Sequence, residues 1–220
     1  STNEYVKRYL GGGEDVIVCA RRQTGGKGTK GRSFSSCEGG VYLSVLNFYR
    51  DFPAEHAFRI MTHSAVAVCR TARAFGVSPQ IKWANDVYVN GKKLCGILIE
   101  NGFGGGKVLW SITGIGVNVN NPLDGLENIA IGLSQAAGRT LSEDAVREEL
   151  IANLQKSDSF ADYLSFVSFL GTEVTIVEGE RSYRAVARRI LEDGRLEVEE
   201  RGNIRALSAA EIKLKLREGD

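Results

Sequence analysis

The sequence changes character at Gly171, and the change divides the chain into two parts that must fold differently. Before it, long apolar segments alternate with helical patterns. After it come five short strand-like runs, separated by turn pairs such as Glu178-Gly179 and Asp193-Gly194: 172–178, 181–190, 195–200, 203–207 and 211–216. Short strands at this spacing are typical of small antiparallel barrels. We therefore predict two domains, residues 1–170 and residues 171–220, the second of them a barrel.

The longest helical pattern of the first part runs from Pro53 to Phe75. Its apolar residues repeat with the 3.6-residue period of a helix, with Pro53 in the first turn and Gly76 as the C-cap. The other segments predict a capping-box helix over 1–10, strands over 15–21, 40–47 and 107–120, two strands within 81–100, and helix over 142–170 with a break near 157–159. The prediction is an α+β fold with a mixed β-sheet flanked by helices.

The composition excludes several classes of protein. The chain has 28 Lys and Arg against 27 Asp and Glu, which is not the basic field of a dedicated nucleic-acid binder. It contains neither a membrane-length apolar run nor a signal-peptide pattern. Its four cysteines are far apart, and His56 and His63 have no third ligand near them, so no metal site is predicted. We expect a cytoplasmic protein that binds neither nucleic acid nor membrane.

Glycines are concentrated in two regions, with nine of the 26 in residues 1–40 and nine more in residues 91–125. The first region contains the loop QTGGKGTKGR at 23–32. It satisfies GxGxxG and nearly satisfies a P-loop, but both motifs must open a helix and the residues after Arg32 are poor helix formers. The signatures that accompany a kinase glycine loop are absent.

The same loop is rich in cations and has no carboxylate. Five basic residues lie between Val16 and Cys37, a stretch without Asp or Glu: Arg21, Arg22, Lys27, Lys30 and Arg32. Glycine backbone N–H groups and cations together favour an anion such as phosphate or carboxylate. The loop therefore predicts an anion cradle, with a flexible solvated loop as the alternative.

A predicted hairpin around Asn90-Gly91 fixes the position of a second cation, Lys93. A two-residue turn there pairs Val89 with Lys92, Tyr88 with Lys93, Val87 with Leu94 and Asp86 with Cys95. Asp86 and Lys93 then share one face of the hairpin, and Lys82 has the parity of Asp86. The alternative is an ordinary surface ion pair.

Four segments in this order resemble the catalytic region of biotin–protein ligases (biotin–[acetyl-CoA-carboxylase] ligases): Ser1-Thr2-Asn3, QTGGKGTKGR, KWANDVYVNGKKLCGIL at 82–98, and GIGVNVN at 114–120. The resemblance implies a class II synthetase-like catalytic domain and an SH3-like C-terminal barrel. It implies that the enzyme uses ATP and Mg²⁺ to convert biotin into biotinoyl-AMP. The biotin is then transferred to a lysine of the biotin carboxyl carrier domain of a carboxylase.

The resemblance also implies the roles of individual residues. Lys93, Lys27 and Asp86 would be catalytic, with Lys93 bridging the biotin carboxylate and the α-phosphate. The implied biotin-binding residues are Ser1, Thr2, Asn3, Gln23, Lys27, Gly28, Thr29, Lys93, Gly96 and Gly116. The implied ATP-binding residues are Lys27, Arg32, Phe34, Lys82, Asn85 and Asn118.

The sequence departs from the family pattern at three places. Lys27 and Thr29 stand where Gly-Arg-Gly-Arg has its two arginines, Phe34 replaces Trp, and Ala84 replaces Pro. Because a cation is lost at Thr29, we expect weaker retention of biotinoyl-AMP than in relatives with both arginines.

Three further questions stay open at this point. Because Ser1-Thr2-Asn3 opens the chain, we expect no DNA-binding domain, and a homodimer is compatible with the sequence. A lipoate or octanoate ligase or transferase of the same superfamily is the first alternative function. A non-catalytic biotin-binding protein is the second.

Overall fold

The computed structural model describes residues 1–208 and 212–215, without the side chains of Lys30 and of residues after 208. The chain forms two compact units, residues 1–166 and 167–220. The division falls after Phe166, whereas the domain boundary that we predicted lies at residue 170. The two units are described separately below.

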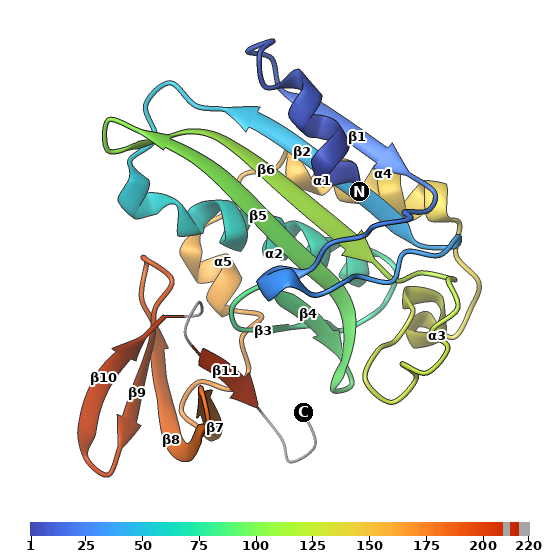
Figure 1. The fold of residues 1–220 in the computed structure, drawn as a ribbon. Coiled ribbons are helices and arrows are strands. Elements are labelled where there is room, and N and C mark those ends of the chain that lie inside the picture. Colours follow the sequence, from blue (N-terminus) through green and yellow to red (C-terminus); the bar gives the residue numbers. More distant parts are fainter. Residues whose placement is uncertain (209–211, 216–220) are drawn as a thin grey trace. The chain divides into compact units, whose positions relative to one another are not determined.

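The first unit is built on one six-stranded sheet (Figure 1). Its strands are β1 (Val16–Ala20), β2 (Val41–Phe48), β3 (Gln80–Lys82), β4 (Asp86–Val89), β5 (Lys92–Gly104) and β6 (Lys107–Val117). Their order is β1-β2-β6-β5-β4-β3, and every strand pair is antiparallel. The α+β class is therefore confirmed, but the sheet is antiparallel and not mixed.

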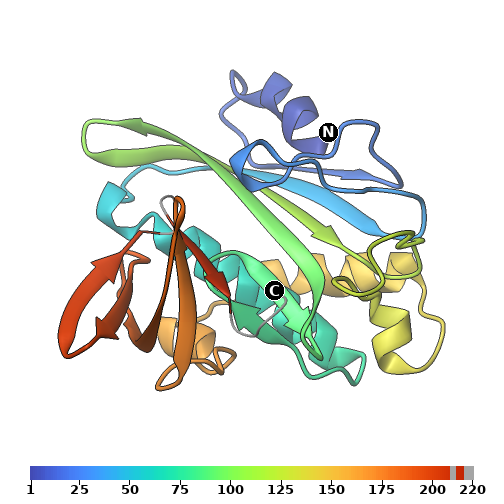
Figure 2. The same ribbon diagram turned by 60° about the horizontal axis from the view of Figure 1, so that its bottom comes forward.

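Helices cover one face of this sheet, and the N-terminal segments lie on the other (Figure 2). The covering helices are α2 (Phe58–Ala74), preceded by the 3-10 turn η3 (Ala54–His56), then α4 (Glu143–Leu154) and α5 (Phe160–Leu164). On the opposite face lie α1 (Thr2–Val6), the 3-10 turn η1 (Lys7–Tyr9) and the glycine-rich loop with its 3-10 turn η2 (Thr29–Gly31). The sheet thus keeps a helix-free surface beside α1, and the loop crosses it.

The long helix was predicted from its apolar stripe, which is buried, but α2 begins at Phe58 and the predicted first turn after Pro53 is the separate 3-10 turn η3. The residues of α2 that face the sheet, among them Ala65, Val68 and Cys69, are almost completely buried. Gly76 follows the helix with φ of +82°, a conformation that suits a C-cap glycine. The predicted break near 157–159 separates α4 from α5, while α3 (Leu133–Ala137) was not predicted.

The N-terminal helix is present without its predicted capping box. Ser1 is the N-cap of α1, but its side chain accepts no capping hydrogen bond. The Glu4 carboxylate instead contacts the ammonium groups of Lys7 and Lys27, 2.9 and 2.7 Å away. Two charged partners replace the backbone N–H that a capping box would offer.

The hairpin contains a bulge that the predicted register lacked. Val89 pairs with Lys92 and Tyr88 with Lys93 as predicted, but the register then shifts, so Val87 pairs with Cys95 and Asp86 with Gly96. The shift places Cys95 on the core side, where it is completely buried like Leu94. Predicting Cys95 on the face of Asp86 was therefore wrong, because one extra residue on the bulged strand reverses the parity of all that follow.

The second unit is a five-stranded antiparallel sheet. Its strands are β7 (Glu173–Glu178), β8 (Arg181–Ile190), β9 (Leu196–Glu200), β10 (Asn203–Leu207) and β11 (Ile212–Lys215), in the order β10-β9-β8-β7-β11. All begin within one residue of their predicted starts; residues 211 and 216 of the last prediction lie outside the described residues. β10 and β11 form the two edges, so the predicted closed barrel is an open sheet in the described part of the chain.

Among the residues that the structure describes, no helix combines the length and the hydropathy of a transmembrane span.

Candidate active site

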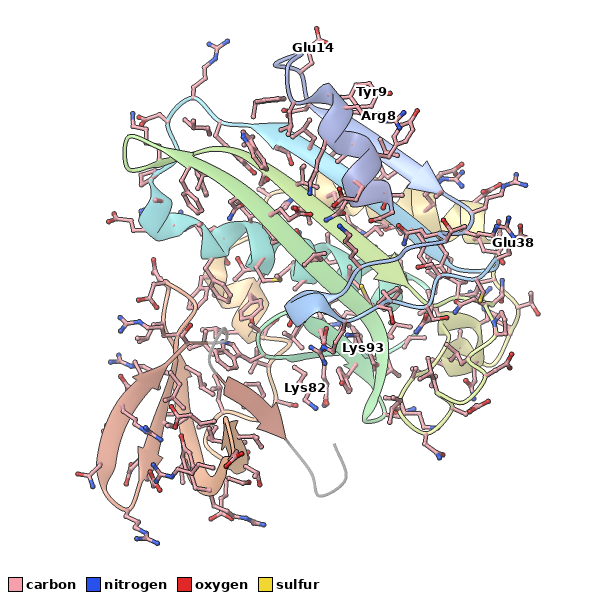
Figure 3. All side chains as sticks on the ribbon, in the orientation of Figure 1. Arg8, Tyr9, Glu14, Glu38, Lys82 and Lys93 are labelled. Carbon is pink, nitrogen blue, oxygen red and sulfur yellow. The ribbon has the colours of Figure 1, made fainter. Side chains whose placement is uncertain are left out.

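The glycine-rich loop crosses β5 and β6 on the face of the sheet that carries α1 (Figure 3), and a pocket lies between these segments. It encloses about 110 Å³ and is lined by residues from four separate segments. The lining residues are Ser1, Thr2, Asn3, Gln23, Lys27, Gly28, Thr29, Arg32, Ser33, Phe34, Asn85, Lys93, Gly96, Ile97, Leu98, Gly114, Ile115 and Gly116.

The floor of the pocket consists of glycines from adjacent strands. Gly96 of β5 lies opposite Gly116 of β6, and Gly114 is two residues earlier on β6. A Cβ atom on Gly116 would lie 2.6 Å from the Phe34 ring, and one on Gly114 would lie 2.2 Å from Asn3 Oδ1. The missing side chains allow the Phe34 ring and the Asn3 amide to lie directly on the sheet backbone.

Lys93 and Asp86 meet at one edge of the pocket. The Lys93 ammonium is 2.7 Å from Asp86 Oδ1, and both side chains are mostly shielded from solvent, with 30% and 21% exposure. The two groups form an ion pair, but they are not oriented as donor and acceptor, and Asp86 Oδ1 accepts no hydrogen bond. The ammonium also lies 6.0 Å from the centre of the Phe34 ring. The geometry confirms the predicted proximity of Asp86 and Lys93.

The backbone of Lys93 is fixed by a distant segment that the motifs did not indicate. Its N–H donates to the carbonyl of Ile129, and its own carbonyl accepts from the N–H of Ile131, at 2.8 and 3.0 Å. Asn118 adds a long contact, from its side-chain amide to the Lys93 carbonyl at 3.4 Å. Both backbone groups of the catalytic candidate are therefore held by residues 129–131.

The glycine-rich loop is a small hairpin of its own. The N–H of Phe34 donates to the carbonyl of Gly26, and the N–H of Gly28 donates to the carbonyl of Arg32. The turn between them contains Gly31 with φ of +72°. The Gly28 N–H is thus used within the loop, which corrects the prediction that the glycine N–H groups are free for an anion.

The cations of the loop do not all face the pocket. Lys27 and Arg32 line it, whereas Arg21 and Arg22 line other surface hollows and the Lys30 side chain lies outside the described part. The Lys27 ammonium pairs with Glu4 at 2.7 Å and so connects the loop to α1. The two lysine contacts hold the pKa of the Glu4 carboxyl at about 2, below its ordinary value.

The N-terminal residues are held by a polar network that begins in the sheet. Gln23 Oε1 accepts the backbone N–H of Thr2 at 2.7 Å, and Gln23 Nε2 donates to Ser36 Oγ at 2.9 Å. The Ser44 hydroxyl, on β2 and completely buried, is 2.7 Å from Thr2 Oγ1 and 2.6 Å from Asn3 Oδ1. The weak Ser-Thr-Asn motif is therefore one of the most firmly held parts of the pocket.

Most of the predicted site residues come together, with three exceptions. All ten predicted biotin-binding residues line the pocket, as do Arg32, Phe34 and Asn85. Asp86 does not line it and reaches it only through Lys93. Asn118 is buried and does not line the pocket, and Lys82 lies opposite Asp86 on the edge strand β3, with its ammonium 4.9 Å from the centre of the Tyr88 ring.

Sequence reasoning missed several residues of the pocket: Ser33, Ile97, Leu98, Gly114 and Ile115. Gly114 belongs to a quoted motif, and its alternation with Gly116 along one strand was a signal that both face the same side. Ser44 carries no sequence signal, since a serine within a buried strand is not distinctive.

No group of three or more His, Cys, Asp and Glu side chains that could hold a metal ion occurs among the described residues. His63 is engaged elsewhere, by Asp158 and by the carbonyl of Leu154.

Comparison with known proteins agrees with this architecture. Residues 1–118 match the model of the biotin/lipoate A/B protein ligase family, and the chain belongs to that family. It is 32% identical over 219 residues to the "Bifunctional ligase/repressor BirA" of Bacillus subtilis, a match that covers 91% of this chain and 66% of that protein. It is 25% identical to the "Biotin--[acetyl-CoA-carboxylase] ligase" of Mycobacterium tuberculosis, over 96% of this chain and 85% of that protein.

A solved structure extends the likeness to the fold. The biotin protein ligase from Aquifex aeolicus in complex with biotin and ATP superposes with a TM-score of 0.74 at 26% identity, covering 98% of this chain and 94% of the other. The present chain spans only 66% of the length of the Bacillus subtilis relative.

Proposed function

We propose that the chain is an ATP-dependent biotin ligase, which makes biotinoyl-AMP and transfers biotin to a lysine of a biotin carboxyl carrier domain. The observation that carries this proposal is the position of Lys93. Its ammonium lies at the edge of a glycine-floored pocket and is balanced by a single carboxylate, that of Asp86. Family membership and the Aquifex aeolicus complex with biotin and ATP support the choice of substrates.

The first step needs stabilisation of negative charge more than it needs a nucleophile from the protein. A carboxylate oxygen of biotin attacks the α-phosphorus of ATP, and the bond to the bridging oxygen breaks to release pyrophosphate. Magnesium would arrive with the phosphates of ATP. Lys93 and Lys27 are cations on two sides of the pocket, where they can stabilise the charge on the α-phosphate and the carboxylate.

Before the substrates bind, the two lysines differ in solvent exposure and in the carboxylate that each one contacts. Lys27 is half-exposed and paired with Glu4, and Lys93 is more shielded and paired with Asp86. An incoming phosphate must compete with a carboxylate for each ammonium. Lys93 keeps its position during this exchange because its backbone is fixed by residues 129–131, whereas Lys27 moves with its loop.

The second step transfers the acyl group. The amine of the carrier lysine attacks the carbonyl carbon of biotinoyl-AMP, the acyl–phosphate bond breaks, AMP leaves, and the amine loses one proton. Asp86 Oδ1 lies 2.7 Å from the Lys93 ammonium. We propose that it orients the incoming amine.

The deciding experiment is ATP–pyrophosphate exchange with biotin, lipoate and octanoate as separate acids. Exchange stimulated by biotin alone is the expected result, followed by transfer of labelled biotin to a carrier domain. Stimulation by lipoate or octanoate and not by biotin would assign the chain to the other branch of its family.

Lys93→Ala tests whether the pocket is catalytic. We expect exchange to fall by roughly 100-fold or more, because a preorganised cation at the developing charge is lost. Lys92→Ala is the matched control: it is the neighbouring residue on β5, and its ammonium donates to the carbonyl of Glu127, away from the pocket. Carrier biotinylation at the wild-type rate in Lys93→Ala would show that Lys93 is not the central cation. A wild-type protein that binds biotin but supports neither exchange nor carrier biotinylation would instead be a non-catalytic biotin-binding protein.

Thr29 bears on how long the intermediate stays bound. Its hydroxyl and carbonyl accept hydrogen bonds from Arg32, so the guanidinium of Arg32 is next to the position where relatives carry an arginine. We propose that biotinoyl-AMP leaves faster than from relatives with both arginines, and that Thr29→Arg slows its release.

A further inference from the structure

The edge strand β1 has an apolar and regular backbone edge without a partner strand. Its residues, VIVCA at 16–20, include no charged residue and no proline, and they pair with β2 without a bulge. Within residues 1–208 and 212–215, β2 is the only strand beside them. The opposite edge of the sheet, β3, is protected, because it carries Lys82 and the N–H of Ile81 donates to the carbonyl of Phe166. An edge without such protection pairs readily with another strand.

The neighbouring strand shows which backbone groups of β1 point outward. On β2, the N–H of Phe48 points toward β1, where it donates to the carboxylate of Asp15 at 2.8 Å. The β2 residue opposite Val18 is four positions from Phe48, so it also faces β1 and bonds to Val18. Ile17 and Cys19 therefore direct their N–H and C=O groups away from β2. Neither residue forms a further backbone hydrogen bond in the described part of the chain.

Charges of opposite sign stand at the two ends of this strand. Glu14 and Asp15 precede it, and Arg21 and Arg22 follow it, so the segment 14–22 reads EDVIVCARR. All four charged residues are exposed. Apart from Asp15, which accepts hydrogen bonds from β2, they form no ion pair or side-chain hydrogen bond with any described residue. The segment is thus complementary in charge to a second copy of itself that runs in the opposite direction.

Backbone geometry allows few registers between two such strands. Outward-facing residues must meet outward-facing residues, as when Ile17 lies opposite Cys19 of the other copy. In this register every acid lies opposite a base on the same face of the sheet. The resulting pairs are Val18 with Val18, Asp15 with Arg21, and Glu14 with Arg22. In the two adjacent allowed registers, with Ile17 opposite Ile17 or Cys19 opposite Cys19, no acid lies opposite a base.

We propose that β1 is a homodimer surface, where two copies of the chain pair through antiparallel β1 strands about a two-fold axis at Val18. The pairing joins two six-stranded sheets into one, satisfies the outward backbone groups and covers Ile17, which is 42% exposed. Because the contact is one strand wide and its ion pairs lie at the surface, the dimer is reversible.

Charge reversal at one ion pair gives a specific test. Glu14→Arg places two arginines at each of the two symmetric contacts of the homodimer, and Arg22→Glu places two glutamates there. We expect each variant alone to dimerise roughly 10-fold more weakly in sedimentation equilibrium. An equimolar mixture of the two variants regains both attractive pairs in a heterodimer, so its affinity should return to the wild-type value. Asp15 is left unchanged because it also accepts the N–H of Phe48.

Ile17→Lys tests the edge itself, since a lysine on an edge strand opposes pairing. Leu109→Lys is the matched control, because Leu109 is 45% exposed on the same sheet but belongs to β6, an inner strand. We expect dimerisation to weaken by roughly 10-fold or more in Ile17→Lys and to stay unchanged in Leu109→Lys. The charge variants lie outside the strand and keep the test available if Ile17→Lys does not fold.

Amide hydrogen exchange at increasing protein concentration reports the register. Protection should rise at Ile17 and Cys19, whose N–H groups point outward, and change less at Val18, which already bonds to β2. A wild-type protein that stays monomeric at every concentration would overturn the inference, as would a mixture of the charge variants that dimerises no better than either alone. A dimer lost in Leu109→Lys and kept in Ile17→Lys would also overturn it and place the interface at the β5–β6 hairpin.

Discussion

The β5–β6 hairpin carries glycines near both of its ends, and the two groups differ in what a side chain would meet. At the pocket, a Cβ atom on Gly114 or Gly116 would lie 2.2 or 2.6 Å from the nearest atom. At the turn, Gly105 and Gly106 have open space around them but φ values of +57° and +75°. The first pair is required by close packing and the second by backbone conformation, although a count of glycines treats them alike.

This difference shows which glycines of the hairpin matter for the pocket and which matter only for the turn. A turn glycine can be replaced at a modest conformational penalty, because an added Cβ atom would meet open space. A floor glycine keeps a space open for Asn3, Phe34 and, in our proposal, the ligand. Substitutions along this one hairpin can therefore separate the two requirements.

Gly114→Ala should have the largest effect. Its methyl group would meet Asn3 Oδ1, which Ser44 holds in place, so Asn3 must leave its position. We expect biotin-dependent ATP–pyrophosphate exchange to fall by roughly 100-fold, since misplacing a binding group by about 1 Å has effects of this size. Wild-type exchange in this variant would show that the position of Asn3 is unimportant.

Gly116→Ala should have a smaller effect, because its methyl group meets a movable neighbour. The Phe34 ring belongs to the glycine-rich loop and can shift away from the floor. We expect a melting temperature close to that of the wild-type protein, and biotin affinity reduced by roughly 10-fold through the lost space. A large fall in melting temperature would instead make the floor a structural requirement.

Gly102→Ala moves the same steric problem away from the pocket. Its Cβ atom would lie 2.2 Å from the Trp110 ring on the neighbouring strand. Overpacking of this kind destabilises a protein by about 1–3 kcal/mol, which chemical denaturation would measure. The exchange activity of the folded protein should stay unchanged, and a loss of activity would blur the distinction between the two parts of the hairpin.

Gly106→Ala tests the turn itself. We expect a loss of about 1 kcal/mol in the free energy of unfolding, because an L-residue is strained at positive φ. Gly106→Asn should lose less, since asparagine tolerates this conformation better. Equal stability of the alanine variant and the wild-type protein would mean that the turn relaxes to another type.

A pH titration extends the comparison from the rigid floor to the loop above it. Because the Glu4 pKa is lowered to about 2, its contacts with Lys27 and Lys7 contribute stability that is fully present above about pH 4.5. The contribution is lost as the pH falls toward 2. Proteolysis of the loop at decreasing pH should accelerate in the wild-type protein and depend less on pH in Glu4→Gln, whereas identical profiles would show that Glu4 does not hold the loop.

Local patterns predicted most of the strands, whereas the resemblance to a family implied most of the residues that line the pocket. The Asn90-Gly91 turn and the alternation around it placed Lys93 near Asp86, and the cations of the glycine-rich loop predicted an anion site, which Lys27 and Arg32 of that loop line. These features are formed by residues that are close together in the sequence, so they can be predicted from it. The resemblance supplied the binding roles, and with them the expectation that the short segment from Ser1 to Asn3 joins the same site.

What could not be predicted depends on contacts between distant residues. The bulge in the hairpin allows both the two-residue turn and the burial of Cys95 in the sheet, and no local pattern predicts it. The support of Lys93 by residues 129–131 and of Thr2 by Ser44 also joins segments more than 30 residues apart. The five strands of the second unit were predicted, but strand lengths do not determine whether the edges of a sheet meet, and in the described residues they form an open sheet.

The bulge between Val87 and Tyr88 has a consequence for changes in chain length. Side chains alternate between the two faces of the sheet both near the tight turn and along the long strand. The bulge shifts one alternation by one residue relative to the other, so each part keeps its own pattern. Deleting Leu94 would remove the surplus residue and join the two phases into one regular ladder. A hairpin built in this way can gain or lose a residue near its turn and still deliver the same side chains to the floor of the pocket.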